Sequence, residues 1–203
     1  MCGVAERLSM ADDVPQEVKD RHIERYRLAI EAVKFNGGLW LDAACGTGYG
    51  TAMIANTADL VLGIDKSKRA LGTARARSRR PGRQPNVLFL HDDLARPSPR
   101  LQWLVQKADA VLSIETIEHL DEYGQEEWIK FVGRSRDSAT LVLSCPIGDG
   151  GRSANPHHLH EPTEDELIRR CARYFHAVEV VAQLRAVMTS GVEQDNLIIR
   201  CRP

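Results

Sequence analysis

Short apolar runs alternate with longer amphipathic segments along most of the chain. The apolar runs are bounded by turn-forming or charged residues and predict buried strands at 39–43, 60–64, 87–90, 110–114 and 140–144. Helix-length segments lie between several of them, at about 49–57, 66–78 and 122–132. This repeated strand-helix-strand order predicts a parallel sheet with helices on both of its faces.

The two ends of the chain extend this pattern. Apolar residues at mostly helical spacing predict an amphipathic helix over 15–34. Near the other end, residues 163–166 have the form of a capping box and predict a helix through about Tyr174. Two more strands, at about 177–181 and 196–201, follow with no helix between them. The pattern therefore predicts an α/β, Rossmann-like fold, in which a seven-stranded and mostly parallel sheet ends in an antiparallel hairpin.

Composition narrows the class of protein. The 203 residues, 43% hydrophobic and 27% charged, fit one globular domain over 1–203. Because 27 Lys and Arg residues nearly balance 28 Asp and Glu residues, no overall field attracts nucleic acid or an anionic membrane. The apolar runs are far shorter than the roughly 20 residues of a membrane span, and the N-terminus lacks a secretory signal. The five cysteines form no C-x-x-C pair, so we expect a protein of the reducing cytoplasm.

A glycine-rich segment carries the strongest chemical signal. The apolar run 39–43 leads into Ala-Cys-Gly-Thr-Gly-Tyr-Gly-Thr at 44–51, and then into a predicted helix. Glycines let the backbone turn tightly and approach a ligand closely, while the start of a helix offers unpaired N–H groups. Asp42 ends the first strand, and Asp65 ends the second strand 23 positions later. An acidic residue at about that offset commonly binds ribose hydroxyls, so a ribose-bearing ligand is favoured.

The same segment argues against a dinucleotide. The dinucleotide-binding pattern requires Gly or Ala at position 51, where this chain has Thr51. A pyrophosphate would also be repelled by a carboxylate as close as Asp42. A ligand with an ammonium and a sulfonium group tolerates that carboxylate, so S-adenosylmethionine fits better than NAD.

The run from Asp42 to Thr51 resembles the first motif of the class I S-adenosylmethionine-dependent methyltransferases. Further segments resemble family elements in family order over about residues 20–200; they include His22-x-x-Arg25-Tyr26, Gly63-Ile64-Asp65, 89–94, 109–115, Glu118-His119-Leu120 and 155–163. The resemblance implies the family's seven-stranded sheet with a final hairpin, as the pattern above predicts. It also implies a single domain in which 1–36 forms a helical lid and 146–162 a loop on the side of the methyl acceptor.

The resemblance implies contacts to each part of S-adenosylmethionine. Asp42 and the loop from Gly46 to Gly48 would hold the methionine part, and Asp65 the ribose hydroxyls. Asp93 would lie near the adenine amino group. Leu94 would flank the adenine ring, Ser113 and Ile114 would line the methionine side, and Tyr26 would cover the site. The full implied set of cofactor-binding residues is Tyr26, Asp42, Ala43, Gly46, Gly48, Asp65, Lys66, Asp93, Leu94, Ser113 and Ile114.

Acidic residues and histidines gather where class I enzymes bind the methyl acceptor. Glu115, Glu118 and His119 have the i, i+3, i+4 spacing of one helix face after the run 110–114. The loop after the run 140–144 adds His157, His158 and His160. If the acceptor is a hydroxyl, an imidazole is the usual group that removes its proton near neutral pH. We therefore predict His119, His157 and His160 as candidate catalytic residues.

The same cluster has two other interpretations. Glu115, Glu118, His119 and one loop histidine resemble the metal motif of small-RNA 3′-terminal 2′-O-methyltransferases, Glu-x-x-Glu-His followed by a distant histidine. Mixed Glu and His ligation suits magnesium, manganese or zinc. Glu118-His119 is also a common family element that packs beneath the acceptor site without taking part in chemistry. We favour a site without metal and keep a divalent metal as the less favoured alternative.

These features lead to one main hypothesis and two alternatives. The main hypothesis is methyl transfer from S-adenosylmethionine to an oxygen of a small molecule or sugar. The alternatives are a metal-dependent 2′-O-methyltransferase of a nucleic-acid terminus and a non-catalytic S-adenosylmethionine-binding partner subunit. A basic run over 66–83 would suit nucleic-acid phosphates, but few aromatics interleave with it, so a solvated helix face is favoured. No membrane partner is expected, and the oligomeric state stays open.

Overall fold

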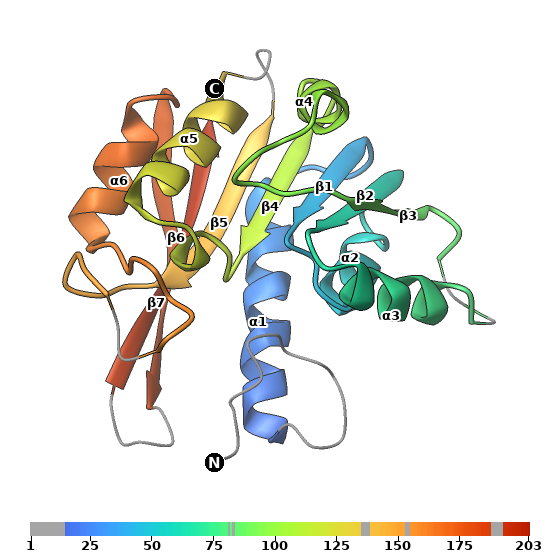
Figure 1. Cartoon of the computed structure of the whole chain (residues 1–203), viewed down its shortest axis with the longest axis horizontal. Helices are drawn as coiled ribbons and strands as arrows, with labels where there is room; N and C mark the ends of the chain where they lie inside the picture. Colours follow the sequence, from blue (N-terminus) through green and yellow to red (C-terminus); the bar gives the residue numbers. More distant parts are fainter. Residues whose placement is uncertain (1–14, 81, 83, 135–138, 153–154, 188–192) are drawn as a thin grey trace.

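A seven-stranded sheet with the order β3-β2-β1-β4-β5-β7-β6 runs through the computed structural model (Figure 1). The structure describes residues 15–80, 82, 84–134, 139–152, 155–187 and 193–203. The strands are β1 Leu39–Ala43, β2 Leu60–Asp65, β3 Val87–His91, β4 Ala110–Ile114, β5 Thr140–Pro146, β6 Ala177–Val187 and β7 Glu193–Arg202. Strands β1 to β5 are parallel, whereas β7 is antiparallel to both β5 and β6. The predicted fold class, including the antiparallel hairpin, is confirmed.

Helices cover both faces of this sheet (Figure 1). In the described ranges they are α1 Gln16–Val33, α2 Tyr49–Ile54, α3 Lys68–Ser78, α4 Pro99–Val105, α5 Glu122–Gly133 and α6 Glu164–Ala172. Apolar side chains of α1 and α2 pack on one face around Trp40 and Leu112, whereas α4, α5 and α6 pack on the other around Leu143. None of the described helices combines the length and the apolar character needed to cross a lipid bilayer.

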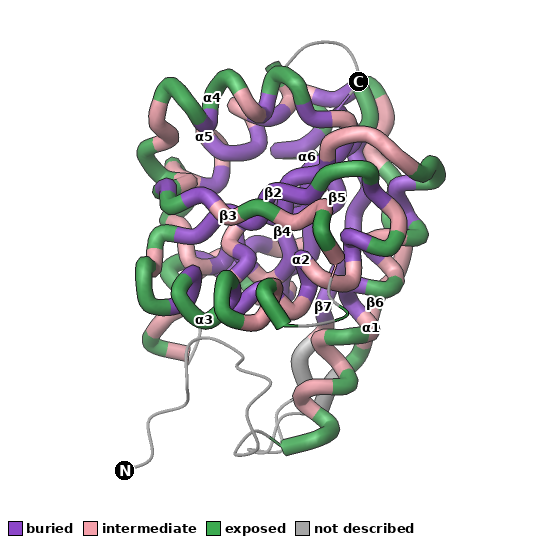
Figure 2. Tube along the Cα trace, turned by 90° about the vertical axis from the view of Figure 1, so that its right-hand side faces the viewer, coloured by how far each residue is buried: buried purple, intermediate pink, exposed green. Residues whose placement is uncertain are grey.

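Burial on both faces explains the continuous apolar runs in the sequence. Every residue of β4 and β5 is buried, and buried segments fill the centre of the molecule (Figure 2). A strand covered on both sides has no solvent-facing positions, so its sequence does not alternate between apolar and polar residues. Polar side chains of the central strands can therefore meet a ligand only where the strands end.

The structure differs from the predicted elements in three places. The helix α4 was not predicted, although Ser98 accepts a hydrogen bond from the N–H of Leu101 and Pro99 occupies the first turn, a known start signal. The hairpin strands β6 and β7 are longer than predicted. The predicted helix face after β4 is wrong, because that segment forms only a 3-10 turn at Ile117–His119, which leaves Glu115 outside it.

Helix α1 packs against the start of α2 through the aromatic ring of Tyr26. The ring of Tyr26 lies against Gly50, where an added Cβ would be 2.1 Å from the ring atom Cζ. Tyr26 is 4% exposed and packs edge-on to Tyr49, with 5.4 Å between ring centroids. The third glycine of the loop is thus required because Tyr26 occupies the space of a side chain. The first 14 residues of the predicted lid lie outside the described residues.

The contact between Tyr26 and Gly50 predicts a large effect of a small substitution. Gly50→Ala should lower the free energy of unfolding by about 1–3 kcal/mol, because the new methyl group displaces a buried ring. Gly72→Ala is the matched control, since nothing lies within 4 Å of its added Cβ in the exposed face of α3. Urea denaturation of the control should show unchanged or slightly raised stability. Equal effects of the two substitutions would contradict this role of Gly50.

Candidate functional site

The order of the strands reverses between β1 and β4, so the crevice between their carboxyl ends is the expected ligand site of this topology. The first residue after each strand has an unusual backbone. Ala44 has φ of 60° and Glu115 has φ of 49°. Such angles are rare and costly for residues other than glycine, and they concentrate at functional sites. Sequence reasoning could not find them, because alanine and glutamate carry no signal for this conformation.

Asp65 ties the glycine-rich loop to the end of β2. Its Oδ2 accepts a hydrogen bond from the N–H of Gly46 at 2.9 Å, and its Oδ1 accepts one from Ser67 at 2.7 Å. Nothing lies within 4 Å of the position of a Cβ on Gly46, so the loop is open to a ligand there. The predicted pair of a glycine loop and an acidic residue at the end of the second strand is therefore brought together.

Asp42 is fully buried behind this loop. Tyr26 Oη donates to its Oδ1 at 3.0 Å, and Thr51 Oγ1 donates to its Oδ2 at 2.5 Å. Burial raises the pKa of Asp42 to about 7, although the two hydrogen bonds act in the opposite direction. Thr51 stands where the dinucleotide-binding pattern has Gly or Ala, and its hydroxyl donates a hydrogen bond to Asp42. Both residues that argued against a dinucleotide are therefore in direct contact.

The remaining predicted cofactor residues lie at the same edge of the sheet. Ala43, Ser113 and Ile114 are buried at the ends of β1 and β4. The hydroxyl groups of Ser113 and Thr47 are buried and have no hydrogen-bond partner among the described residues. A buried hydroxyl without a partner is costly, so both suit contact with a polar ligand.

The adenine side of the predicted site is more exposed. Lys66 and Asp93 are exposed, and Leu94 is half-buried. The neighbouring Asp92 is buried instead and accepts hydrogen bonds from the N–H and hydroxyl of Ser98, which begins α4. Asp92 therefore has a structural task, which favours Asp93 as the carboxylate that faces a ligand.

A cavity of about 120 Å³ lies between α2, α3 and β3. Its lining includes Gly48 but none of the other predicted cofactor residues. Gly48 has φ of 76°, and a Cβ there would lie 2.8 Å from Ala74, so glycine is required by both conformation and space. Apart from Gly48, the cavity therefore does not include the predicted cofactor residues, and the strand ends of β1 and β4 remain the expected ligand site.

Glu115 contacts residues other than those with which it was predicted to share a helix face. Its Oε1 accepts a hydrogen bond from Ser144 Oγ at 2.9 Å and lies 3.6 Å from Nε of Arg25. Asn196 Nδ2 lies 3.5 Å from the other oxygen, and Arg25 donates to the Asn196 side chain at 2.9 Å. These contacts join β4, β5, β7 and α1, and they correct the predicted grouping of Glu115 with Glu118 and His119.

A second group forms around Glu118 in the turn after β4. One ligand atom from each of Glu118, His119 and His158 lies within 4.8 Å of the others. The rings of the two histidines are 5.1 Å apart in an edge-on arrangement. The carbonyl of Glu118 accepts a hydrogen bond from the N–H of Leu159 at 2.8 Å. The loop after β5 is therefore fastened to the 3-10 turn after β4.

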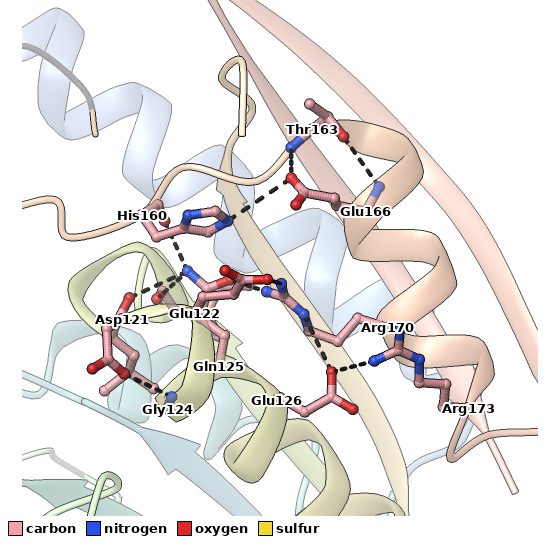
Figure 3. Close-up of polar contacts among 12 residues, drawn as sticks. Asp121, Glu122, Gly124, Gln125, Glu126, His160, Thr163, Glu166, Arg170 and Arg173 are labelled. Carbon is pink, nitrogen blue, oxygen red and sulfur yellow. Dashed lines mark hydrogen bonds and ion pairs between the residues drawn. The ribbon is translucent and has the colours of Figure 1, made fainter. Parts of the chain in front are cut away.

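The other two predicted catalytic histidines lie differently. His157 contacts His119 through its backbone, since its carbonyl accepts a hydrogen bond from Nδ1 of His119 at 3.0 Å. His160 is buried, and its ring lies 3.8 Å from a carboxylate oxygen of Glu166 on α6 (Figure 3). Its carbonyl accepts a hydrogen bond from Gln125 on α5 at 2.7 Å. The structure thus places His119 and His158 together and directs His160 toward the helices α5 and α6.

The chain is similar to known methyltransferases in sequence. Residues 41–135 match the family described as a methyltransferase domain. A probable S-adenosylmethionine-dependent methyltransferase of Mycobacterium tuberculosis (strain ATCC 25618 / H37Rv) is 32% identical over 134 residues, which are 63% of this chain and 44% of the relative. A similarly named protein of Mycolicibacterium smegmatis is 31% identical over 63% of this chain and 47% of its own length. The chain thus spans less than half the length of the curated relatives it matches.

Solved structures share the fold at low sequence identity. The YcgJ protein of Bacillus subtilis has a TM-score of 0.72 at 14% identity, over 90% of this chain and all of the other. Magnesium protoporphyrin IX methyltransferase of Synechocystis with bound SAM has a TM-score of 0.67 at 19% identity, over 97% and 87% of the two chains. The N-methyltransferase NodS of Bradyrhizobium japonicum with S-adenosylhomocysteine has a TM-score of 0.66 at 18% identity, over 95% and 90%.

The buried Asp42 predicts a particular dependence of stability on pH. Its pKa is about 7 in the folded protein and 3.8 ordinarily, so between these values the folded state holds a proton that the unfolded state has lost. Stability from this group therefore falls as the pH rises. Between pH 5 and 7, urea denaturation should show the wild type losing about 2 kcal/mol more than Asp42→Asn, which cannot ionise. Parallel pH profiles of the two proteins would contradict the raised pKa.

Proposed function

We propose that this chain, which belongs to the class I S-adenosylmethionine-dependent methyltransferases, transfers a methyl group from S-adenosylmethionine to an oxygen of a small molecule or sugar. Membership of the family confirms the resemblance drawn from the sequence, and S-adenosylmethionine is the cofactor of the family. The acceptor, the acceptor atom and the activity of this chain are parts of the proposal.

The arrangement of Asp42, Gly46 and Asp65 at the strand reversal is the observation that carries this function. Asp65 has its carboxylate at the end of β2, where a ribose would lie beside the open side of Gly46. The buried charge of Asp42 favours a cationic ligand, and a cation beside it stabilises its ionised form. The unpartnered hydroxyls of Thr47 and Ser113 add polar atoms on the methionine side.

The chemistry requires mainly correct placement of the reactants. When bound, S-adenosylmethionine supplies a methyl group on a sulfonium, which the acceptor oxygen displaces in line as the carbon–sulfur bond breaks and S-adenosylhomocysteine forms. The chain holds the cofactor at the ends of β1 and β2 and presents the acceptor between the loops that follow β4 and β5. Holding both reactants in this orientation supplies much of the acceleration.

We assign loss of the acceptor's proton to His119. Because Nδ1 of His119 faces the carbonyl of His157, which only accepts, the proton of the neutral ring lies on Nδ1 and the lone pair on Nε2. A fixed tautomer with an accepting nitrogen is what proton removal requires. In this proposal His157 orients His119, and His160 supports the loop through Gln125 and Glu166.

Two alternatives make different predictions for the purified chain. A non-catalytic subunit would bind S-adenosylmethionine without turning it over with any acceptor. A methyltransferase of nucleic-acid termini would use the exposed basic residues of α3, which include Lys68 and Arg69, to hold phosphates. The nearly balanced charge of the chain favours the small-molecule or sugar acceptor.

Cofactor binding should depend on the charge of Asp65. Asp65→Asn should weaken S-adenosylmethionine binding by about tenfold, because the amide cannot accept from the loop N–H groups and the ribose hydroxyls together. Asp59→Asn is the matched control, since Asp59 accepts a backbone hydrogen bond from Gly38 before β1, at the opposite edge of the sheet. Isothermal titration calorimetry with S-adenosylmethionine and S-adenosylhomocysteine measures both variants. Equal affinity of Asp65→Asn and the wild type would contradict the assigned site.

Turnover should depend on His119 without a matching effect on cofactor affinity. His119→Ala should lower kcat by about 10²–10⁴ with a hydroxylated acceptor, because the proton is no longer removed. His176→Ala is the control, since His176 is exposed between α6 and β6. Formation of S-adenosylhomocysteine during an acceptor screen gives the rate, and calorimetry gives the affinity. A parallel loss of cofactor binding in His119→Ala would refute this division of roles.

A further inference from the structure

We propose that Gln125 is a positioning residue, which holds His119 in the orientation that proton removal requires. This role rests on the function proposed above. The buried residues of α5 follow the i, i+3, i+4, i+7 spacing of a core-facing stripe, and they are Gln125, Trp128, Ile129 and Val132. Gln125 thus places a fully buried amide where this pattern expects an apolar side chain. A buried amide is costly unless its groups are hydrogen-bonded, so its partners show what it does.

The amide nitrogen of Gln125 joins the turn after β4 to the loop after β5. Its Nε2 donates to the carbonyl of Ile117 at 2.9 Å and lies 3.3 Å from that of Leu120, so it contacts both ends of the 3-10 turn. The same nitrogen donates to the carbonyl of His160 at 2.7 Å (Figure 3). An amide nitrogen carries two N–H groups that three carbonyls can share, whereas an aliphatic side chain would satisfy none of them.

Arg170 on α6 fixes the other end of this amide. Its Nη1 donates to Oε1 of Gln125 at 2.5 Å, and its side chain is buried (Figure 3). The charge of the guanidinium is balanced by Glu122 and Glu126, whose carboxylate oxygens lie 3.5 and 3.4 Å from its other nitrogens. A guanidinium only donates, so Oε1 must face Arg170 and Nε2 must face the three carbonyls. The orientation of Gln125 is therefore set by its partners on both sides.

The two segments that Gln125 joins are the ones that orient His119. The ring of His119, the last residue of the turn, donates through Nδ1 to the carbonyl of His157 in the loop at 3.0 Å. The turn and the loop are also joined by one main-chain bond, from the N–H of Leu159 to the carbonyl of Glu118 at 2.8 Å. Loss of the Gln125 contacts would let the two segments shift and would weaken the bond that keeps Nε2 of His119 able to accept a proton.

The tautomer of His119 tests this role without an acceptor. Long-range ¹H–¹⁵N NMR of the histidine-labelled chain at about pH 8.5, where histidine rings in general are neutral, shows which ring nitrogen carries the proton. The wild type should carry it on Nδ1, with the signal assigned by its loss in His119→Ala. Gln125→Glu keeps the size of the side chain and a partner for Arg170 but removes the N–H donors. It should shift the tautomer ratio toward Nε2–H by roughly five- to tenfold.

Two controls separate positioning from a general loss of stability. Ile129→Val removes a buried methyl group from the same helix but no hydrogen bond. Gln102→Met removes an exposed amide, which donates to the carbonyl of Pro97 at 3.1 Å beside α4. Both should keep the wild-type tautomer of His119, and circular dichroism shows whether each variant is folded. Arg170→Lys is a second variant that keeps the positive charge but loses the planar donor group, and it should shift the tautomer in the same direction by a smaller factor.

Turnover provides the second measurement, once the acceptor screen has found a substrate. Gln125→Glu should lower kcat by about 10- to 100-fold, while calorimetry shows an unchanged affinity for S-adenosylmethionine. The inference is overturned if folded Gln125→Glu has the wild-type tautomer ratio, if Ile129→Val shifts that ratio equally, or if the tautomer shifts without loss of kcat. The two proposals fail separately. Normal turnover of His119→Ala refutes His119 as the base, whereas an unshifted tautomer in Gln125→Glu refutes only the positioning by Gln125.

Discussion

Helices cover both faces of the central parallel strands, so polar groups on these strands can reach a ligand only at the strand ends. The reversal of strand order between β1 and β4 marks one of these ends as the expected ligand site of this topology. Two residues with strained backbones, Ala44 and Glu115, begin the loops on either side. The residues predicted to contact the cofactor or the acceptor lie in or beside the loops that follow the strands. These loops are the places where polar side chains from different strands can come together.

On the cofactor side, two carboxylates organise the glycine-rich loop in different ways. Asp65 accepts backbone N–H groups and ties the loop to β2, whereas Asp42 is buried and held by the hydroxyls of Tyr26 and Thr51. The same Tyr26 ring fills the space beside Gly50 and so joins α1 to the loop. The N-terminal helix therefore supports the glycine-rich loop as well as being part of the core.

After β4, two polar groups lie close together but have separate contacts. Glu115 is held by Arg25, Ser144 and Asn196, which come from three different elements. Glu118 instead meets the two histidines, His119 and His158, and the loop after β5 is fastened to its carbonyl. The buried carboxyl group of Glu118 has an oxygen without a hydrogen-bond partner among the described residues, which is costly in a folded protein.

The sequence by itself determined the α/β alternation, the final hairpin, the glycine-rich loop and the placement of Asp42 and Asp65 at strand ends. These features are local, because apolar runs, glycines and the residues beside them are neighbours in the chain. It did not reveal α4, whose short apolar pattern depends on a cap at Ser98 that Asp92 holds in place. Only the tertiary structure decided that Glu115 turns toward Arg25 and that His158 joins Glu118 and His119. The reason is that these contacts join segments that are far apart in the sequence.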